Sequence, residues 1–204
     1  MPKQTFFNLS DDKKENLINA AKKEFSRVPL NEALISNIVK SAGIARGSFY
    51  QYFDDKEDAF FFLLDEYSKE NKANFILHLK KTDGDLFETF IEMFHSMLKN
   101  FEDKERRDFF RNAFLNMNHK IENTFTKNFD EDRFHHELLE IENLVNKKNI
   151  NISDEHEFYY VLEILMAITF HNLIHSFAKE LPFEESLKNY TYEIQLLKRG
   201  LYKE

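Results

Sequence analysis

Residues 37–58 read NIVKSAGIARGSFYQYFDDKED and predict two short helices joined by a tight turn. Apolar residues before Gly43 follow helical spacing, and a glycine just past a helix favours the left-handed backbone that ends it. A second helix is expected over about residues 45–52, where Phe49 and Phe53 lie one helical turn apart and can pack inward. Two short helices joined by a glycine-containing turn form a helix-turn-helix unit.

The neighbouring residues predict a helix on each side of this unit. Ser10 can cap a first helix, and Pro29 stops it. Asp55 can cap a long helix over about residues 56–80, and Asp58, three residues later, makes an imperfect capping box. We therefore interpret the acidic end of the quoted stretch as helix-capping chemistry.

Further along the chain, apolar residues keep helical spacing and no strand-like alternation persists. The chain has 204 residues with 4 Gly and 3 Pro, two residue types that helix interiors tolerate poorly. We therefore expect an all-α fold of about nine helices. The later helices are expected at about residues 85–101, 105–119, 121–148, 154–179 and 183–202.

Composition excludes several classes of protein. Charged residues make up 31% of the chain and hydrophobic ones 42%, which indicates a folded and soluble protein. The chain has no cysteine, which excludes disulfides and thiol chemistry and suits a reducing cytoplasm. The first residues carry no apolar signal segment, so we expect a cytoplasmic protein. Residues 158–178 are long and apolar, but Glu163, His171 and Asn172 indicate a buried helix rather than a membrane span.

Charge is spread unevenly along the sequence. Residues 1–56 carry a net charge of +2, from nine Lys and Arg against seven Asp and Glu, and residues 57–204 carry −10. This asymmetry indicates two functional parts, of which the N-terminal one can approach an anion.

The helix over residues 45–52 is a candidate for reading DNA. The second helix of a helix-turn-helix unit enters the major groove, where its N-terminal residues contact base edges. Arg46 can pair with guanine, Gln51 with adenine, and Ser48 with bases or phosphate. Helix pairs with a glycine turn are also common in all-α proteins, so a purely structural pair is the alternative.

Further residues of the same region suit contacts with the DNA backbone. Gly47 has no side chain, so the main chain can come close to DNA. Tyr50 and Tyr52 have hydroxyls that can reach phosphates, and Lys56 can bind another phosphate together with the amides that open the next helix. The candidate DNA-binding residues are Arg46, Gly47, Ser48, Tyr50, Gln51, Tyr52 and Lys56, with Ser36 and Asn37 on the preceding helix.

The run LINAAKKEF at residues 17–25, followed by the quoted stretch, resembles the N-terminal domain of the TetR family of bacterial transcriptional regulators. Its specific features lie between Ile38 and Lys56: an Ala-Gly-hydrophobic turn, Gly-x-x-Tyr, Tyr-x-x-Phe, and a final Lys-Glu. The resemblance implies a homodimer of nine-helix chains that represses transcription until a small molecule binds. It implies a DNA-binding domain at residues 1–56 and a helical ligand-binding and dimerisation domain at residues 57–204.

Three features depart from the family pattern. Pro29 stands where a glycine usually follows the first helix, and Ala45 stands where a serine usually precedes the recognition helix. Ala33 and Leu34 replace the usual Thr/Ser pair at the start of the second helix, so we expect Asn31 to cap it instead. These departures keep open a ligand-binding or partner-binding helical protein that has lost DNA binding.

The C-terminal helices are candidates for dimerisation. Residues 158–178 are apolar nearly all round, which suits a helix that faces its own core on one side and a partner on the other. A helix buried within a monomer is the alternative. A symmetric dimer would match a palindromic DNA site. The final helix offers an apolar stripe of Tyr190, Ile194, Leu197 and Leu201.

Aromatic and aliphatic residues of the C-terminal part are candidates for an apolar pocket, although residues at helical spacing also suit a plain core. Such a lining would suit a hydrophobic or aromatic effector. The candidates are Phe87, Phe90, Phe94, Phe110, Phe114, Tyr159, Leu162 and Met166.

The sequence argues against metal chemistry. His171 and His175 have a spacing that can bind zinc, but no third ligand is evident, so we expect buried, hydrogen-bonded histidines. A di-iron helical bundle needs two Glu-x-x-His motifs, and this chain has Glu92 to His95 and only an approximate second in Asp132 to His135. We therefore predict no catalytic residue, metal or cofactor, with a helical-bundle metalloenzyme as the alternative.

Overall fold

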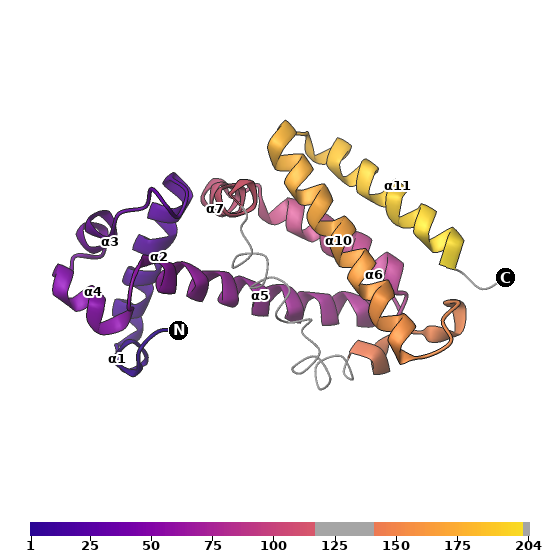
Figure 1. The fold of residues 1–204 in the computed structure, drawn as a ribbon, viewed down its shortest axis with the longest axis horizontal. Coiled ribbons are helices and arrows are strands. Elements are labelled where there is room, and N and C mark those ends of the chain that lie inside the picture. The colour runs from indigo at the N-terminus through magenta and orange to yellow at the C-terminus, as the bar shows by residue number, and fades with distance from the viewer. Residues whose placement is uncertain (117–140, 202–204) are drawn as a thin grey trace. The chain divides into compact units, whose positions relative to one another are not determined.

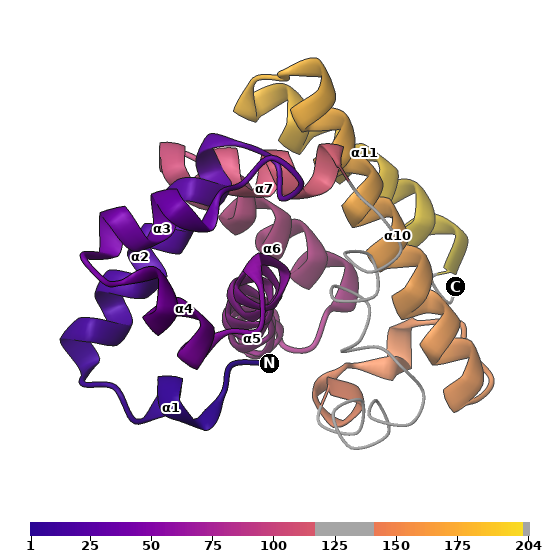
Figure 2. The same cartoon turned by 60° about the vertical axis from the view of Figure 1, so that its left-hand side comes forward.

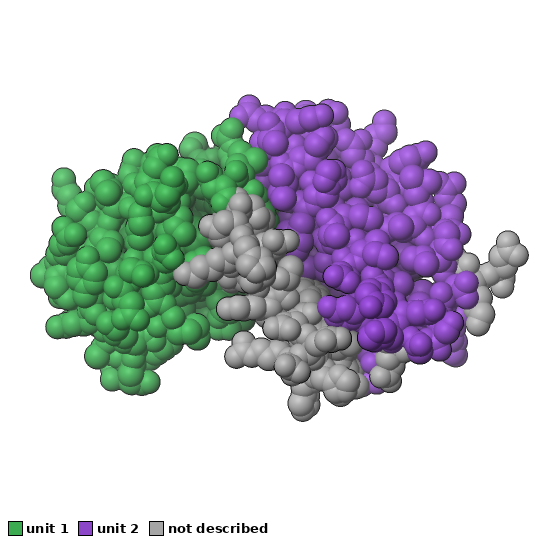
Figure 3. Space-filling model, viewed as in Figure 1, with its two compact units in different colours: residues 1–69, 101–125 green, residues 70–100, 126–204 purple. Residues whose placement is uncertain are grey.

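The computed structural model describes residues 1–116 and 141–201, and over these ranges it contains helices and no β-strand. The contacts within the chain divide it into two compact units (Figure 3). Unit 1 comprises residues 1–69 and 101–125, and unit 2 comprises residues 70–100 and 126–204. The predicted all-α fold is confirmed, while the predicted helix over 121–148 lies mostly outside the described residues.

Unit 1 is built from the helix-turn-helix pair and the helices packed against it (Figure 1). The helix α5 runs on from this unit into the other. The elements of unit 1 are α1 (Gln4–Phe7), α2 (Asp11–Arg27), α3 (Ile35–Ala42), α4 (Arg46–Tyr52), the first part of α5 (Lys56–Lys81) and α7 (Lys104–Leu115).

Aromatic rings form the core of unit 1. The ring centroid of Phe60 lies 5.2 Å from that of Phe25 on α2 and 5.4 Å from that of Phe109 on α7. The side-chain amide of Asn112, also on α7, donates to the carbonyl oxygens of Phe25 at 3.0 Å and Ser26 at 2.9 Å. These bonds satisfy carbonyl oxygens at the C-terminal end of α2, where the helix itself supplies no further N–H donor. The helix α7 is thus an integral part of the unit that holds the helix-turn-helix pair.

Unit 2 contains the end of α5, α6 (Leu86–Asn100), the short helix η2 (Lys147–Asn149), α10 (Glu155–Lys179) and α11 (Phe183–Leu201). The ring of Phe94 stacks on Tyr190 with 3.9 Å between centroids, which joins α6 to α11. The Tyr190 hydroxyl lies 2.7 Å from the hydroxyl of Thr169 on α10. Burial raises the pKa of the Tyr190 phenol above its ordinary value. Tyr190 therefore ties three helices of this unit together, through ring stacking on α6 and a hydrogen bond to α10.

Most of the predicted helix boundaries are confirmed. Ser10 occupies the N-cap position of α2, but its side chain makes no capping hydrogen bond, so only its position is confirmed. Gly43 ends α3 with a left-handed φ of +67°. The later helices α6, α10 and α11 begin and end within one or two residues of their predicted limits. The short helix α1 was not predicted, because a single helical turn leaves no periodic pattern.

The prediction that Asn31 caps α3 is wrong. The helix begins at Ile35, with Leu34 at the N-cap position, so Asn31 lies too early in the chain to reach the first free amides. The chain turns before the helix starts, since the Ala33 amide donates to the Pro29 carbonyl at 3.1 Å. Leu34 is 54% exposed, so it lies outside the buried apolar face of this helix.

The predicted buried helix at residues 158–178 is α10. Among the described residues, its segment His156–Lys179 has the length and hydropathy that could also cross a membrane. In unit 2, however, Phe158, Leu162 and Leu165 are buried in the core. The helix is therefore a core helix on one side, with an exposed apolar face on the other.

Candidate nucleic-acid interface

The helix α4 separates an apolar inner face from a polar outer face. Phe49 on the helix and Phe53 just after it are buried, with 5.5 Å between their ring centroids. The predicted DNA-facing residues lie at the surface: Arg46, Gly47, Tyr50 and Gln51 are exposed, and Ser48 and Tyr52 are half-buried. The helix and its polar face therefore follow directly from the sequence pattern. Figure 2 shows the course of α4 next to α3.

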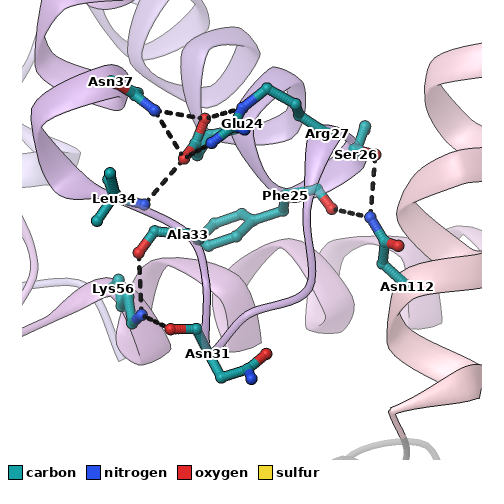
Figure 4. A network of polar contacts seen from close by, with 10 residues as sticks. All are labelled: Glu24, Phe25, Ser26, Arg27, Asn31, Ala33, Leu34, Asn37, Lys56 and Asn112. Atoms are coloured by element: carbon teal, nitrogen blue, oxygen red, sulfur yellow. Dashed lines mark hydrogen bonds and ion pairs between the residues drawn. The ribbon is translucent and has the colours of Figure 1, made fainter.

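A glutamate network joins α2 to the start of α3 (Figure 4). The buried Glu24 carboxylate accepts a hydrogen bond from the Leu34 amide at 2.9 Å and pairs with Arg27 at 2.7 Å. It also accepts from the side-chain amide of Asn37. The side chain of Asn37, a predicted DNA-binding residue, thus holds α3 against α2, whereas Ser36 beside it is exposed.

The charge of Glu24 is maintained by its partners. Burial of the carboxylate favours its neutral form, but the hydrogen bonds from Arg27, the Leu34 amide and Asn37 outweigh burial and lower the pKa of Glu24. The carboxylate is therefore ionised at neutral pH. Sequence reasoning missed the role of this residue. Its spacing places it on the same face as the buried residues of α2, but two of its partners, the Leu34 amide and Asn37, come from beyond the helix.

Lys56 has structural partners that the sequence did not predict. Its ammonium donates to the carbonyl oxygen of Asn31 at 2.8 Å and to that of Ala33 at 2.9 Å (Figure 4). These bonds hold the loop before α3 against the start of α5. A lysine ammonium has three N–H donors, so one remains for a phosphate oxygen.

The acidic run after α4 caps the next helix, as predicted. The Asp58 amide donates to the Asp55 carboxylate at 2.8 Å. In return the Asp58 carboxylate accepts from the amide of Asp54 at 3.2 Å, one residue before the position that a regular capping box uses. The carboxylates of Asp55 and Asp58 are therefore engaged with the main chain.

A shallow groove with a volume of about 430 Å³ runs along unit 1 between α2 and α3. Its lining carries positive charge around the Glu24 carboxylate. The lining residues are Ala20, Lys23, Glu24, Arg27, Asn37, Lys40 and Ser41.

The candidate pocket residues are divided between the two units. Phe110 and Phe114 are buried on α7 and belong to unit 1, where Phe110 packs 5.0 Å from the ring of Tyr67. The other candidates belong to unit 2, where Phe94 stacks on Tyr190. Within unit 2 the residues Phe87, Phe90, Phe94 and Leu162 are buried, and Tyr159 and Met166 are half-buried. A pocket lined by these residues stays a prediction.

The histidines and acids considered for metal binding are dispersed. Over the described ranges, no cluster of three or more His, Asp or Glu side chains could hold a metal ion. His171 is exposed and its ring stacks on half-buried His175 with 6.0 Å between centroids, so their predicted burial would need a partner chain. Glu92 pairs with Lys81 at 3.0 Å, and the pair Asp132 and His135 lies outside the described residues.

Large apolar side chains are exposed on both α10 and α11. Tyr160 and Ile164 on α10 are 50% and 45% exposed, and Tyr192 and Leu196 on α11 are 62% and 48% exposed. The stripe predicted on the final helix faces the other way: Tyr190 and Ile194 are buried and Leu197 and Leu201 half-buried. Clusters of exposed apolar side chains are typical of interaction surfaces in proteins.

Two family models match the chain. Residues 17–61 match the model described as bacterial regulatory proteins, tetR family. Residues 85–201 match the model of the tetracyclin repressor-like C-terminal domain. The chain is also similar to the helix-turn-helix transcriptional regulator YvdT of Bacillus subtilis (strain 168), with 46% identity over 56 residues. That similarity spans 28% of this chain and 26% of the length of YvdT.

Solved structures share the fold over nearly the whole chain. SmeT, the repressor of a Stenotrophomonas maltophilia multidrug efflux pump, is 14% identical with a TM-score of 0.68, over 95% of this chain and 94% of its own. FadR of Bacillus subtilis, solved with stearoyl-CoA, is 13% identical with a TM-score of 0.63, over 88% and 96%. A regulator from Chloroflexus aurantiacus J-10-FL is 22% identical with a TM-score of 0.53, over all of both chains.

Proposed function

The chain belongs to the TetR family of bacterial regulatory proteins and is a DNA-binding transcriptional regulator, and from this premise we propose that it is a repressor that reads its operator with α4. The observation that carries the proposal is the division of α4 into a buried face anchored by Phe49 and an exposed polar face. A regulator of this kind acts by binding rather than by catalysis.

In the proposed complex, α4 lies in the major groove. Arg46 contacts guanine, Gln51 contacts adenine and Ser48 contacts a base or a phosphate. These three side chains lie at least partly at the surface of one short helix, which supports a common binding partner.

Backbone contacts then set the register of the protein on the duplex. Tyr50 and Tyr52 supply hydroxyls, Lys56 supplies its remaining N–H, and exposed Ser36 supplies a hydroxyl from α3. The main chain at Gly47 approaches the DNA closely. Asn37 contributes indirectly, because its amide is bonded to Glu24.

The repressor acts as a homodimer on a palindromic operator. The apolar side chains exposed on α10 and α11, Ile164 and Leu196 among them, support this proposal, since burying them against a second copy removes apolar surface from water. A two-fold dimer presents two copies of α4 to two half-sites of the DNA.

A small hydrophobic or aromatic effector is proposed to release the repressor from DNA. The phenylalanines of α6 support an apolar effector. The similarity to FadR, which was solved with the long acyl chain of stearoyl-CoA, points in the same direction. We place the protein in the cytoplasm, where both DNA and such effectors are accessible.

The test is selection of genomic DNA fragments by the purified full-length protein, followed by binding measurements on the enriched fragment. We expect a fragment with an inverted repeat, bound far more tightly than a scrambled duplex of equal length. Recovery of fragments in proportion to their abundance in the input would overturn the proposal.

A further inference from the structure

The helix α4 is too short to be stable by itself. It has seven residues, and isolated helices shorter than about 12–15 residues are marginal in water. It also contains Gly47, a poor helix former, and its N-cap position is occupied by Ala45, whose side chain has no polar atom. Contacts from elsewhere in the unit must therefore hold it.

The N-terminal segment of the chain supplies these contacts. The last four carbonyl oxygens of a helix have no partner within the helix. In α4 the Phe49 carbonyl accepts from the Phe53 amide at 2.9 Å, and the next three all accept from residues 3 and 5. The Lys3 ammonium donates to the Tyr50 carbonyl at 2.9 Å. The Lys3 amide donates to the Tyr52 carbonyl at 2.8 Å.

Thr5 completes the set, because its hydroxyl donates to the carbonyl oxygen of Gln51. Two residues of the N-terminal segment thus cap the three carbonyls of Tyr50, Gln51 and Tyr52. These are the same residues whose side chains face outward on the second half of α4. Fixing their carbonyls fixes the backbone from which those side chains project.

The segment is itself anchored in the core of unit 1. The buried ring of Phe6 lies 5.2 Å from that of Phe53, directly after α4, and 5.2 Å from that of Phe62 on α5. The Lys3 ammonium additionally pairs with Asp54 at 2.8 Å. The caps are therefore held in place by packing on both sides of the recognition helix.

We propose that Lys3 and Thr5 are positioning residues for DNA reading, which set the orientation of α4 by capping its C-terminal end. The inference rests on the proposed role of α4 as the reading helix. Sequence-specific binding needs α4 in one orientation, whereas non-specific binding to phosphates tolerates several. Loss of a cap is therefore expected to weaken the specific complex more than the non-specific one.

The test compares Thr5→Val and Lys3→Met with Gln4→Ala and Lys13→Met in the full chain. Gln4 is exposed between the two capping residues, and Lys13 is an exposed lysine on α2. The DNA probes are the fragment enriched from the genome and a scrambled duplex of equal length. Thr5→Val and Lys3→Met are expected to weaken binding to the enriched fragment by about three- to tenfold with little change on the scrambled duplex. The two control variants should bind both like wild type.

Thr5 distinguishes positioning from a direct phosphate contact, because its side chain carries no charge. For Thr5→Val the dependence of binding on salt should keep the slope of the wild type. Thr5→Ser keeps the hydroxyl and is expected to restore wild-type binding. If Lys3→Met lost affinity equally on both duplexes with a shallower salt slope, and Thr5→Val lost none, the positioning role would be wrong.

A second readout needs no DNA. Amide hydrogen exchange at residues 49–53 is expected to speed up in Thr5→Val and Lys3→Met, while exchange in the core of α2 stays unchanged. If the wild-type protein selected no DNA but amide exchange at residues 49–53 was faster in both variants, the proposed function would be wrong, while the capping of α4 by Lys3 and Thr5 would be supported. Unchanged exchange at residues 49–53 in both variants would overturn the inference.

Discussion

The side-chain amide of Asn37 donates to both carboxylate oxygens of Glu24, at 3.0 and 3.2 Å. Glu24 lies on α2 and Asn37 on α3, so the pair joins two helices of the helix-turn-helix region. The same carboxylate accepts from the amide of Leu34, the residue at the N-cap of α3. A residue on a neighbouring helix thus satisfies a main-chain donor at the start of α3, where Ala33 and Leu34 have no side-chain oxygen.

Glu24→Ala is expected to lower the free energy of unfolding by about 2–3 kcal/mol, because it leaves the Leu34 amide and the Asn37 amide without their acceptor. Urea denaturation at neutral pH measures the change. The control is Glu15→Ala on the exposed face of α2, which should stay within about 0.5 kcal/mol of wild type.

The contribution of Glu24 should also depend on pH. Its pKa is below the ordinary value of 4.5, so the folded state binds a proton less readily than the unfolded state. The stabilisation is therefore complete above about pH 5 and is lost as the pH falls through the lowered pKa. As the pH falls below about 5, the difference in free energy of unfolding between wild type and Glu24→Ala should shrink. A difference that stays constant would contradict the lowered pKa of Glu24.

Arg46→Ala is expected to weaken operator binding by about 1–3 kcal/mol and to relax the choice of base at its contact position. Fluorescence anisotropy on operators with single base-pair changes measures both effects. Lys23→Ala, which removes a charge from α2 rather than α4, should leave the ranking of operators unchanged. If Arg46→Ala ranked the operators like wild type, the base contact would be wrong.

Lys56→Ala is expected to weaken binding to operator and scrambled DNA alike and to make the salt dependence shallower. It should also cost about 1 kcal/mol of stability, because two loop carbonyls lose their donor. Asn31→Ala is the matched control, since the Lys56 ammonium bonds to its main-chain oxygen and not to its side chain. Equal salt slopes for wild type and Lys56→Ala would exclude the phosphate contact.

Two glycines should respond in opposite ways to alanine. Gly43→Ala is expected to destabilise the protein by about 1–2 kcal/mol, because φ is +67° there. Gly47 is helical, and a Cβ there would meet no atom of the described residues within 4 Å. Gly47→Ala should therefore raise stability by about 0.5–1 kcal/mol and yet weaken operator binding, if the main chain approaches DNA. Thermal unfolding and anisotropy together check this pair.

Ile164→Asp is expected to convert the proposed dimer into a monomer, because the new charge on α10 would be buried between two copies. Light scattering at micromolar concentration measures the mass. Leu77→Asp on α5 is the control, since Leu77 is 64% exposed and lies on neither α10 nor α11. A wild-type monomer would contradict the dimer itself.

The parts of the fold that were predictable depend on residues close together in the sequence. Gly43 ends its helix, and Phe49 and Phe53 pack one turn apart. The Asp55 side chain caps the next helix by accepting from the amide three positions later. Such signals are local, so spacing alone reveals them. The candidate interface on α4 follows from the same spacing.

The features that were missed depend on tertiary contacts. Thr5 caps a carbonyl 46 residues away, and Glu24 binds a main-chain amide 10 residues away across a turn. Lys56 was predicted only as a phosphate contact. Its partners in the loop are main-chain carbonyl oxygens, which every residue has, so the sequence does not reveal them. The pocket residues could not be separated from core, because both uses require the same apolar side chains.

The packing of α7 against α2 limits how this protein can be dissected. Unit 1 combines two separate stretches of chain, and Phe109 of α7 covers the ring of Phe60. A recombinant fragment that stops soon after the helix-turn-helix would expose this ring and would lack the Asn112 bonds to α2. A portable DNA-reading module would therefore need residues 101–116 joined back through an engineered linker, rather than a simple truncation.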